Sequence, residues 1–242
     1  MNYKTSVWEG FKRIDFDFEG KNAIVIFPEA AIKGNKWLFK TAYFGAFPEF
    51  EIEMLKKGYA LAFVTSTTRW CLPEDTERQA RFAKFLHKEF NFSKKCVPVG
   101  MSCGGMQAIF LAAKHPKLVA AMYLDAPVVN LLSCPCGMGD ADDSMFEEFF
   151  GHFKLTKSQM LNYREHPRDY LNCFLKSKIP VFLVAGDSDK TVPYHENGEI
   201  VDKFYREHNL DITTIVKPGC DHHPHGIEDN TTLVSFVEKY YK

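Results

Sequence analysis

Short apolar segments alternate with amphipathic segments along most of the chain, and this alternation restricts the fold more than any other feature. Residues 23–27 (AIVIF) are all apolar, as expected for a strand buried on both faces of a sheet. Similar apolar segments and intervening helical patterns predict an α/β fold with a mostly parallel, doubly wound sheet and helices on both faces. The other predicted strands are 13–18 (an edge strand), 60–64, 96–99, 119–124, 181–185 and 212–216, and the predicted helices are 49–57, 74–90, 104–115, 194–208 and 228–241.

One interval is too long for a simple connection between neighbouring strands. Residues 128–178 separate two predicted strands. Within them Ser144 and Glu147 have capping-box spacing, and Phe149, Phe150 and Phe153 follow. We therefore expect a single domain over residues 1–242, with a helical insertion over 128–178 that is a candidate lid. A peripheral packing element without contact to a substrate is the alternative.

Composition and charge exclude several kinds of partner. The chain has 242 residues, 30 basic and 31 acidic, for a net charge of −1. Its basic residues form isolated pairs such as Lys56–Lys57 rather than the stripe typical of nucleic-acid-binding proteins. No apolar segment approaches the roughly 18 residues of a membrane span. We expect a small-molecule partner, no nucleic acid and no membrane span, and the composition gives no indication of oligomeric state.

Cysteine usage points to a reducing compartment. The chain has seven cysteines, an odd number, and its first 15 residues lack the apolar core of a signal peptide. Free thiols in a cytoplasmic protein are therefore expected rather than a disulfide framework.

A G-x-S-x-G pentapeptide at Gly100, Ser102 and Gly104 lies between a predicted buried strand and a predicted helix. In that setting a sharp turn exposes the serine hydroxyl at the helix N-terminus, where developing negative charge is stabilised. Ser102 is the candidate nucleophile, and the backbone N–H of Cys103 is a candidate donor to an oxyanion. A glycine-rich turn without a catalytic role is the alternative.

A serine hydroxyl needs an oriented base, and the last two predicted strands lead into loops that offer an acid and a base. After 181–185 come Asp187 and Asp189. We assign Asp189 as the acid because it lies further into the loop, whereas Asp187 is expected to brace the turn. Asp187 is nevertheless the alternative acid, and Asp125, which follows an earlier strand, is the third candidate.

The loop after the last predicted strand carries His222, His223 and His225. His222 is the candidate base, His223 is the alternative, and His225 is expected to be a structural or pocket-wall residue. Together with Cys220 and Asp221 these are zinc-ligand types, but Pro224 prevents a regular helix from presenting the histidines one turn apart. We therefore expect neither a metal nor an organic cofactor.

The order Ser102, Asp189, His222, each after a predicted strand, resembles the α/β-hydrolase superfamily over nearly the whole chain. The matching motifs are G-x-S-x-G (100–104), G-D-x-D-x-x-V-P (186–193) and G-x-x-H (219–222). More narrowly, the chain resembles small bacterial hydrolases of the prolyl-oligopeptidase-like or carbohydrate acetyl-esterase-like kind. The segments that carry this closer likeness are 34–37, 44–48, 124–127 and 222–225.

The resemblance implies a serine hydrolase that works through an acyl-enzyme, with a second oxyanion donor from the loop after the third strand. We place that loop at 28–34, where the N–H of Glu29 or Ala30 is the expected donor because Pro28 has none.

The resemblance also implies a carboxylic ester substrate, with a short acyl group such as acetyl on a carbohydrate or small alcohol. Trp37, Trp70 and His223 are candidate substrate-binding residues, with ordinary core packing as the alternative for the two tryptophans. A thioesterase, an amidase or peptidase on the same triad, and a catalytically weak binding module are the alternative functions.

Overall fold

A computed structural model describes residues 2–32 and 34–242, and its described strands form one nine-stranded sheet in the order β1-β2-β3-β5-β4-β6-β7-β8-β9. Strands β1, β2, β3 and β5 are antiparallel neighbours, whereas β5, β4, β6, β7, β8 and β9 are parallel neighbours. The strands are β1 (Lys4–Trp8), β2 (Phe11–Phe18), β3 (Lys21–Phe27), β4 (Trp37–Lys40), β5 (Ala60–Val64), β6 (Val97–Met101), β7 (Met122–Asp125), β8 (Val181–Gly186) and β9 (Ile212–Lys217).

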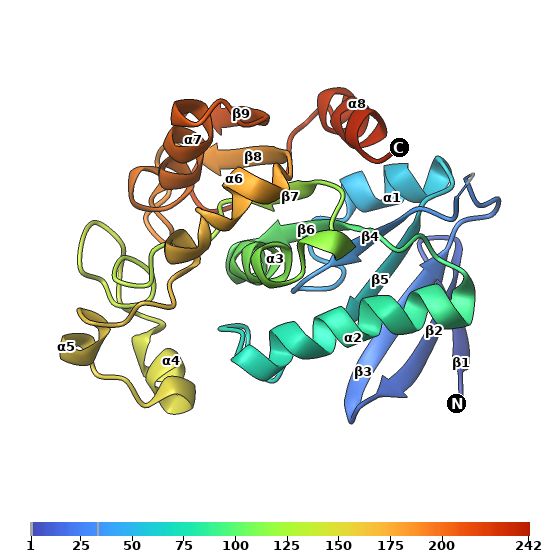
Figure 1. Cartoon of the computed structure of the whole chain (residues 1–242), viewed down its shortest axis with the longest axis horizontal. Coiled ribbons are helices and arrows are strands. Elements are labelled where there is room, and N and C mark those ends of the chain that lie inside the picture. Colours follow the sequence, from blue (N-terminus) through green and yellow to red (C-terminus); the bar gives the residue numbers. More distant parts are fainter. Residues whose placement is uncertain (1, 33) are drawn as a thin grey trace.

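Helices cover both faces of this sheet, so the predicted α/β class is confirmed (Figure 1). Side chains of α2, α3 and α7 pack on one face, and those of α1 and α8 pack on the other. The helices are α1 (Glu49–Lys56), α2 (Pro73–Phe90), α3 (Cys103–Lys114), α4 (Phe146–Phe153), α5 (Lys157–Met160), α6 (Cys173–Ser177), α7 (Gly198–Glu207) and α8 (Thr231–Tyr240), with short 3₁₀ turns η1 (Pro116–Leu118), η2 (Pro167–Tyr170) and η3 (Tyr194–Glu196).

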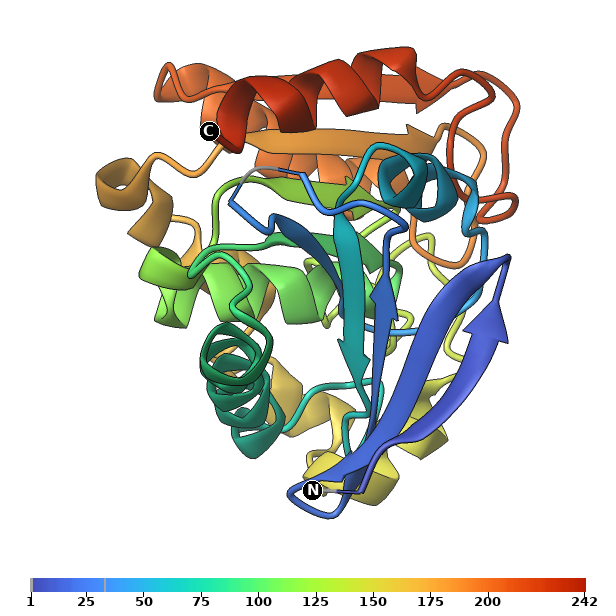
Figure 2. The same ribbon diagram turned by 90° about the vertical axis from the view of Figure 1, so that its right-hand side faces the viewer.

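Two strands were not predicted from the sequence. Strand β1 is exposed along most of its length and forms the edge of the sheet beside β2 (Figure 2), so no apolar alternation marks it. Because β1 occupies that edge, the prediction that 13–18 is an edge strand was wrong. Strand β4 has only four residues and ends in Lys40, whose charge is buried against Glu51 at 2.5 Å. A short strand that ends in a lysine lacks the apolar signature of its neighbours.

Between β7 and β8 the chain forms α4, α5, η2 and α6. Helices α4 and α5 lie away from the sheet at one end of the molecule (Figure 1), whereas Phe174 of α6 packs in the core on the face that α3 and α7 cover. Phe149 of α4 packs edge-on against Trp70, and this contact joins the segment to the main body. The side chain of Asn197 accepts hydrogen bonds from the N–H groups of Val129 and Asn130, each at 3.0 Å, and so holds the beginning of the segment. The predicted capping box was wrong: α4 begins at Phe146, and the Ser144 hydroxyl donates to Asp142 instead.

None of the helices in the described part of the chain combines the length and the apolarity that crossing a bilayer requires.

Candidate active site

Ser102 lies at the tight turn between β6 and α3, with φ 53° and ψ −122°. The turn brings the backbones of Gly100 and Gly104 so close that a Cβ on Gly100 would lie 2.5 Å from the Gly104 carbonyl oxygen. The Thr41 hydroxyl donates to that same carbonyl oxygen at 2.7 Å. A positive φ at a serine is strained backbone that the surrounding contacts must maintain, and here it projects Ser102 from the start of α3.

His222 links Ser102 to Asp189. Its Nε2 lies 3.1 Å from the Ser102 Oγ, and its Nδ1 lies 2.7 Å from Oδ2 of Asp189. The second carboxylate oxygen of Asp189 accepts the N–H groups of Thr191 (2.9 Å) and Val192 (2.7 Å), which fix its orientation. All three side chains are buried. This is the arrangement in which an imidazole can take a hydroxyl proton while a carboxylate holds its tautomer.

The loops that carry Asp189 and His222 are bonded to each other. The N–H of Ser188 donates to the carbonyl of Cys220 at 3.0 Å, and Asp187 accepts the N–H of Gly219 at 2.7 Å. Asp187 therefore ties the two loops together and makes no described contact with His222. The distance between Asp189 and His222 is therefore set by these contacts between the loops as well as by the Asp189–His222 bond.

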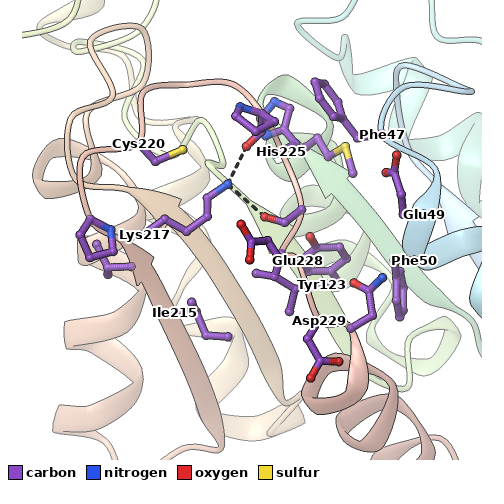
Figure 3. A pocket seen from close by; sticks show the side chains of 17 residues that line it. Phe47, Glu49, Phe50, Tyr123, Ile215, Lys217, Cys220, His225, Glu228 and Asp229 are labelled. Atoms are coloured by element: carbon purple, nitrogen blue, oxygen red, sulfur yellow. Dashed lines mark hydrogen bonds between the residues drawn. The ribbon is translucent and has the colours of Figure 1, made fainter.

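A second buried carboxylate, Asp125, bonds to His225 instead of His222, with Nδ1 and Oδ1 2.8 Å apart. Asp125 also accepts the Tyr123 hydroxyl at 2.9 Å and the N–H of Gly226 at 2.6 Å. The loop after β9 that carries His222, His223 and His225 is called the histidine loop. Lys217 also holds this loop, because its ammonium donates to the carbonyls of Pro224 (2.6 Å) and Gly226 (3.0 Å) (Figure 3). The histidine loop is thus bonded at residues 219–220 by Asp187 and Ser188, and at residues 224–226 by Asp125 and Lys217.

Figure 3 looks into a cavity of about 820 Å³ behind this loop, whereas Ser102 opens into a smaller cavity of about 330 Å³. His225 borders both. Lys40 braces the wall of the smaller cavity, since its ammonium donates to the Ala46 carbonyl at 3.2 Å as well as to Glu51. The residues that line the Ser102 cavity are Tyr43, Ala46, Phe47, Arg69, Met101, Ser102, Met145, Thr191, His222, His223 and His225.

Of the three residues predicted to bind substrate, only His223 lines the Ser102 cavity. Trp37 is fully buried in β4, where its indole donates to the Ser93 carbonyl at 2.9 Å. Trp70 is also buried and packs against the helical segment. Both predictions were wrong, because aromatic rings in this chain mainly fill the core.

The predicted position of the second oxyanion donor was also wrong. Strand β3 is antiparallel to β5, so the loop after β3 lies at the opposite end of the sheet from Ser102. There Ala30 is exposed, and the N–H of Ile32 donates to the Gly58 carbonyl at 2.8 Å. The predicted loop 28–34 includes residue 33, which lies outside the described residues. The loop that approaches Ser102 instead follows the unpredicted strand β4, where Thr41 and Ala42 pack against Gly104.

Sequence reasoning missed several residues of the cavity wall, among them Tyr43, Arg69 and Met145. Tyr43 follows β4, Arg69 follows β5, and Met145 belongs to the segment between β7 and β8. Arg69 donates from Nε to Glu148 of α4 at 2.8 Å, which holds that helix over the site. Tyr43 and Arg69 each follow a parallel strand, and that position could have identified them as candidates for the cavity wall. For Tyr43 this would have required a prediction of β4.

Burial controls the protonation of the groups around Ser102. It raises the pKa of the Cys103 thiol to about 11, so this neighbour stays protonated and is a poor nucleophile. Burial also raises the pKa of Tyr43, whose hydroxyl therefore remains a proton donor at neutral pH. Desolvation, followed by the nearby His225 and His222 rings, lowers the pKa of His223 and favours its neutral imidazole.

The sheet, the strand–turn–helix elbow at Ser102 and the late histidine define an α/β-hydrolase fold. The family model described as "Prolyl oligopeptidase family" matches residues 73–242, and the chain belongs to that family.

Solved structures with the same fold are larger proteins. The acylaminoacyl peptidase of Pyrococcus horikoshii matches 99% of this chain over 42% of its own, with 15% identity and a TM-score of 0.71. A puromycin-hydrolysing peptidase of Mycobacterium tuberculosis matches 90% over 36% of its chain, with 16% identity and a TM-score of 0.67. Dipeptidyl peptidase 4 of Porphyromonas gingivalis matches 99% over 35%, with 13% identity and a TM-score of 0.65. The chain therefore spans well under half of each.

We predict that Asp189→Asn lowers kcat for hydrolysis of an activated ester by about 10⁴-fold, because the amide stabilises the wrong tautomer of His222. Asp187→Asn is the matched control, an identical change in the same loop at a carboxylate that contacts Gly219 instead of His222. It should change kcat by less than about tenfold. Steady-state kinetics on both folded variants measure the difference, and the opposite order would transfer the acid role to Asp187.

Proposed function

We propose that this protein hydrolyses esters of short acyl groups through an acyl-enzyme on Ser102, with His222 as general base and Asp189 as the orienting acid. The observation that carries the proposal is the continuous contact from Ser102 Oγ through both nitrogens of His222 to Asp189, at 3.1 Å and 2.7 Å. A positioned imidazole of this kind converts a weak hydroxyl into an effective nucleophile.

In the proposed reaction Ser102 Oγ attacks the acyl carbon while His222 Nε2 takes its proton. His222 then protonates the leaving oxygen, and the alcohol departs. Water then attacks the acyl carbon while His222 Nε2 takes its proton, and His222 passes that proton to the Ser102 Oγ as the acyl–oxygen bond breaks, which releases the acid and restores Ser102. Asp189 remains ionised and stabilises the imidazolium that forms in each half of the reaction.

Two donors are proposed for the oxyanion: the backbone N–H of Cys103 and the hydroxyl of Tyr43. Cys103 is the first residue of α3, so its N–H has no partner within the helix and lies at the positive end of the dipole. Tyr43 lines the same cavity from the loop after β4, and its raised pKa keeps the hydroxyl protonated. Such donors act most strongly on charge that develops in the transition state.

The cavity supports a small, uncharged acyl group. Its volume of about 330 Å³ lies at the lower end of the range for small-molecule sites. Among the described residues no carboxylate lines it, so a substrate ammonium would find no opposite charge there. The one guanidinium in the wall, Arg69, is already paired with Glu148.

Hydrolysis of a peptide or other amide is the second candidate, and the family favours it. The structural neighbours named above are peptidases, and the same triad can protonate a leaving amine. The absence of a lining carboxylate among the described residues then favours an acylated peptide over one with a free amino terminus.

We expect a fluorophosphonate probe to add once to the wild-type protein and not to Ser102→Ala, as measured by intact mass. Ser102→Ala and His222→Ala should each lower kcat by about 10⁴-fold or more, and the double variant should be little worse than either, because the groups act as a unit. Additive losses, or an adduct on Ser102→Ala, would contradict the assignment.

Unactivated substrates distinguish the two candidate functions, since any serine hydrolase attacks activated esters readily. We expect acetate release from an acetylated monosaccharide to exceed cleavage of N-acetyl-alanyl-alanine p-nitroanilide by at least about tenfold in kcat/KM. A ranking in the other direction would establish the amide as the preferred substrate and overturn the esterase proposal.

Tyr43→Phe should lower kcat by about 10²-fold with a small change in KM, because it removes one donor to the oxyanion while keeping the ring. Tyr163→Phe, in the segment between α5 and η2, is the matched control and should leave kcat near the wild-type value. If Tyr43→Phe raised KM without lowering kcat, the hydroxyl would be a contact to the ground-state substrate instead.

A further inference from the structure

Three imidazoles meet at the mouth of the Ser102 cavity. The ring centroids of His222, His223 and His225 lie 4.9 Å apart in each of the three pairs. One nitrogen from each ring falls in a group whose members all lie within 4.8 Å of one another. The triad uses only the first of these rings, so the clustering of the other two is not explained by acyl transfer.

Two of the rings are already oriented as metal ligands usually are. Asp189 holds His222 at Nδ1 (2.7 Å), and Asp125 holds His225 at Nδ1 (2.8 Å). Each carboxylate is buried and bonded in turn to backbone N–H groups. A carboxylate on one imidazole nitrogen fixes the ring and raises the basicity of the other, which is the usual outer shell of a histidine-bound metal. In both rings the nitrogen left for a ligand is Nε2.

The third ring, His223, is the more exposed one and stacks on Phe47 with centroids 5.5 Å apart and an angle of 14°. Three nitrogens around zinc lie about 3.3 Å from one another, given tetrahedral geometry and Zn–N bonds near 2.0–2.1 Å. The cluster must therefore contract, through rotation of the exposed His223 side chain together with a small shift of the His222 and His225 rings toward each other.

We propose that His222, His223 and His225 bind one zinc-type divalent cation through three imidazole nitrogens, and that the ion inhibits the enzyme. Bound at Nε2 of His222, it occupies the atom that would take the proton of Ser102. Imidazole ligands select zinc, copper and nickel over magnesium and calcium, which prefer oxygen. The inhibitory part rests on the proposed function, whereas binding itself does not.

The sequence-based expectation of no metal depended on Pro224, which excludes a helix with histidines one turn apart. The structure brings the rings together by a different route. A tight turn anchored by Lys217 and Asp125 places residues 222, 223 and 225 around one point, so no helix is needed.

Calorimetric titration of the chelator-stripped full chain with zinc chloride tests the site, using Ser102→Ala so that turnover plays no part. We expect one zinc ion per chain, a Kd in the micromolar range or tighter, and no binding of magnesium. His223→Ala and His223→Gln, both at a partly exposed ring, should weaken binding at least tenfold. The matched control is His195→Ala, in the separate exposed group Asp140, His195 and Glu196, and it should leave the affinity unchanged.

No zinc binding to the folded chain at millimolar concentration would overturn the proposal. Binding that survives both His223 variants, or that is lost in His195→Ala, would also overturn it by placing the ion elsewhere. Circular dichroism of each variant excludes loss of binding through unfolding.

Inhibition is tested separately on the wild-type chain. Zinc should slow fluorophosphonate labelling of Ser102 at least tenfold, and excess chelator should restore the rate. Zinc that binds to the histidines without slowing the probe would overturn the inhibitory part. If the metal-free protein were not labelled at all, the proposed function would fail, while calorimetry would still decide whether the site exists.

Discussion

The close approach of strand β6 to the start of helix α3 is the constraint on which the rest of the site depends. Gly100 and Gly104 touch through their backbones, and a Cβ on Gly105 would lie 2.4 Å from that of Pro127. Larger residues would push the helix away from the sheet and relax the positive φ of Ser102. The strain at one serine is therefore maintained by small residues on both sides of it and by the chain that follows β7.

The parallel half of the sheet explains why distant residues meet at Ser102. Strands β4 to β9 are parallel, so the loops that follow them leave the sheet at one edge. Tyr43, Ser102, Asp189 and His222 each come from a different one of these loops. Direct hydrogen bonds between the last two loops then reduce their relative freedom, so Asp189 and His222 are held in place independently of any bound molecule.

The histidine loop is held by several hydrogen bonds and carries three histidines within four residues. Asp125 and Lys217 both bond to residues 224–226 of the loop, and Asp125 also orients His225. One consequence is that His222 Nε2 is held 3.1 Å from the Ser102 Oγ. Another is that His222, His223 and His225 each present a ring nitrogen within 4.8 Å of the other two, and the proposed zinc site is built on this grouping.

Residue patterns alone identified most of the architecture and the central residues of the site. Strands buried on both faces carry continuous apolar runs, and the matches from β3 to β9, except β4, follow from that physics. The order of Ser102, Asp189 and His222 after such strands was enough to predict that they would lie together, because parallel strands deliver their following loops to one edge.

Tertiary structure alone decided which residues complete the cavity. Strand β4 is short and ends in Lys40, whose burial is compensated by Glu51 from α1, a partner that no local pattern reveals. Without β4, the loop after β3 was taken for the oxyanion loop, and Tyr43 was overlooked. Aromatic side chains occur both in pockets and in cores, so residue type alone does not show that Trp37 and Trp70 are buried outside the Ser102 cavity. The chain determines its elements through local periodicity, whereas the cavity wall is determined by strand order and by charge pairs between elements far apart in the sequence.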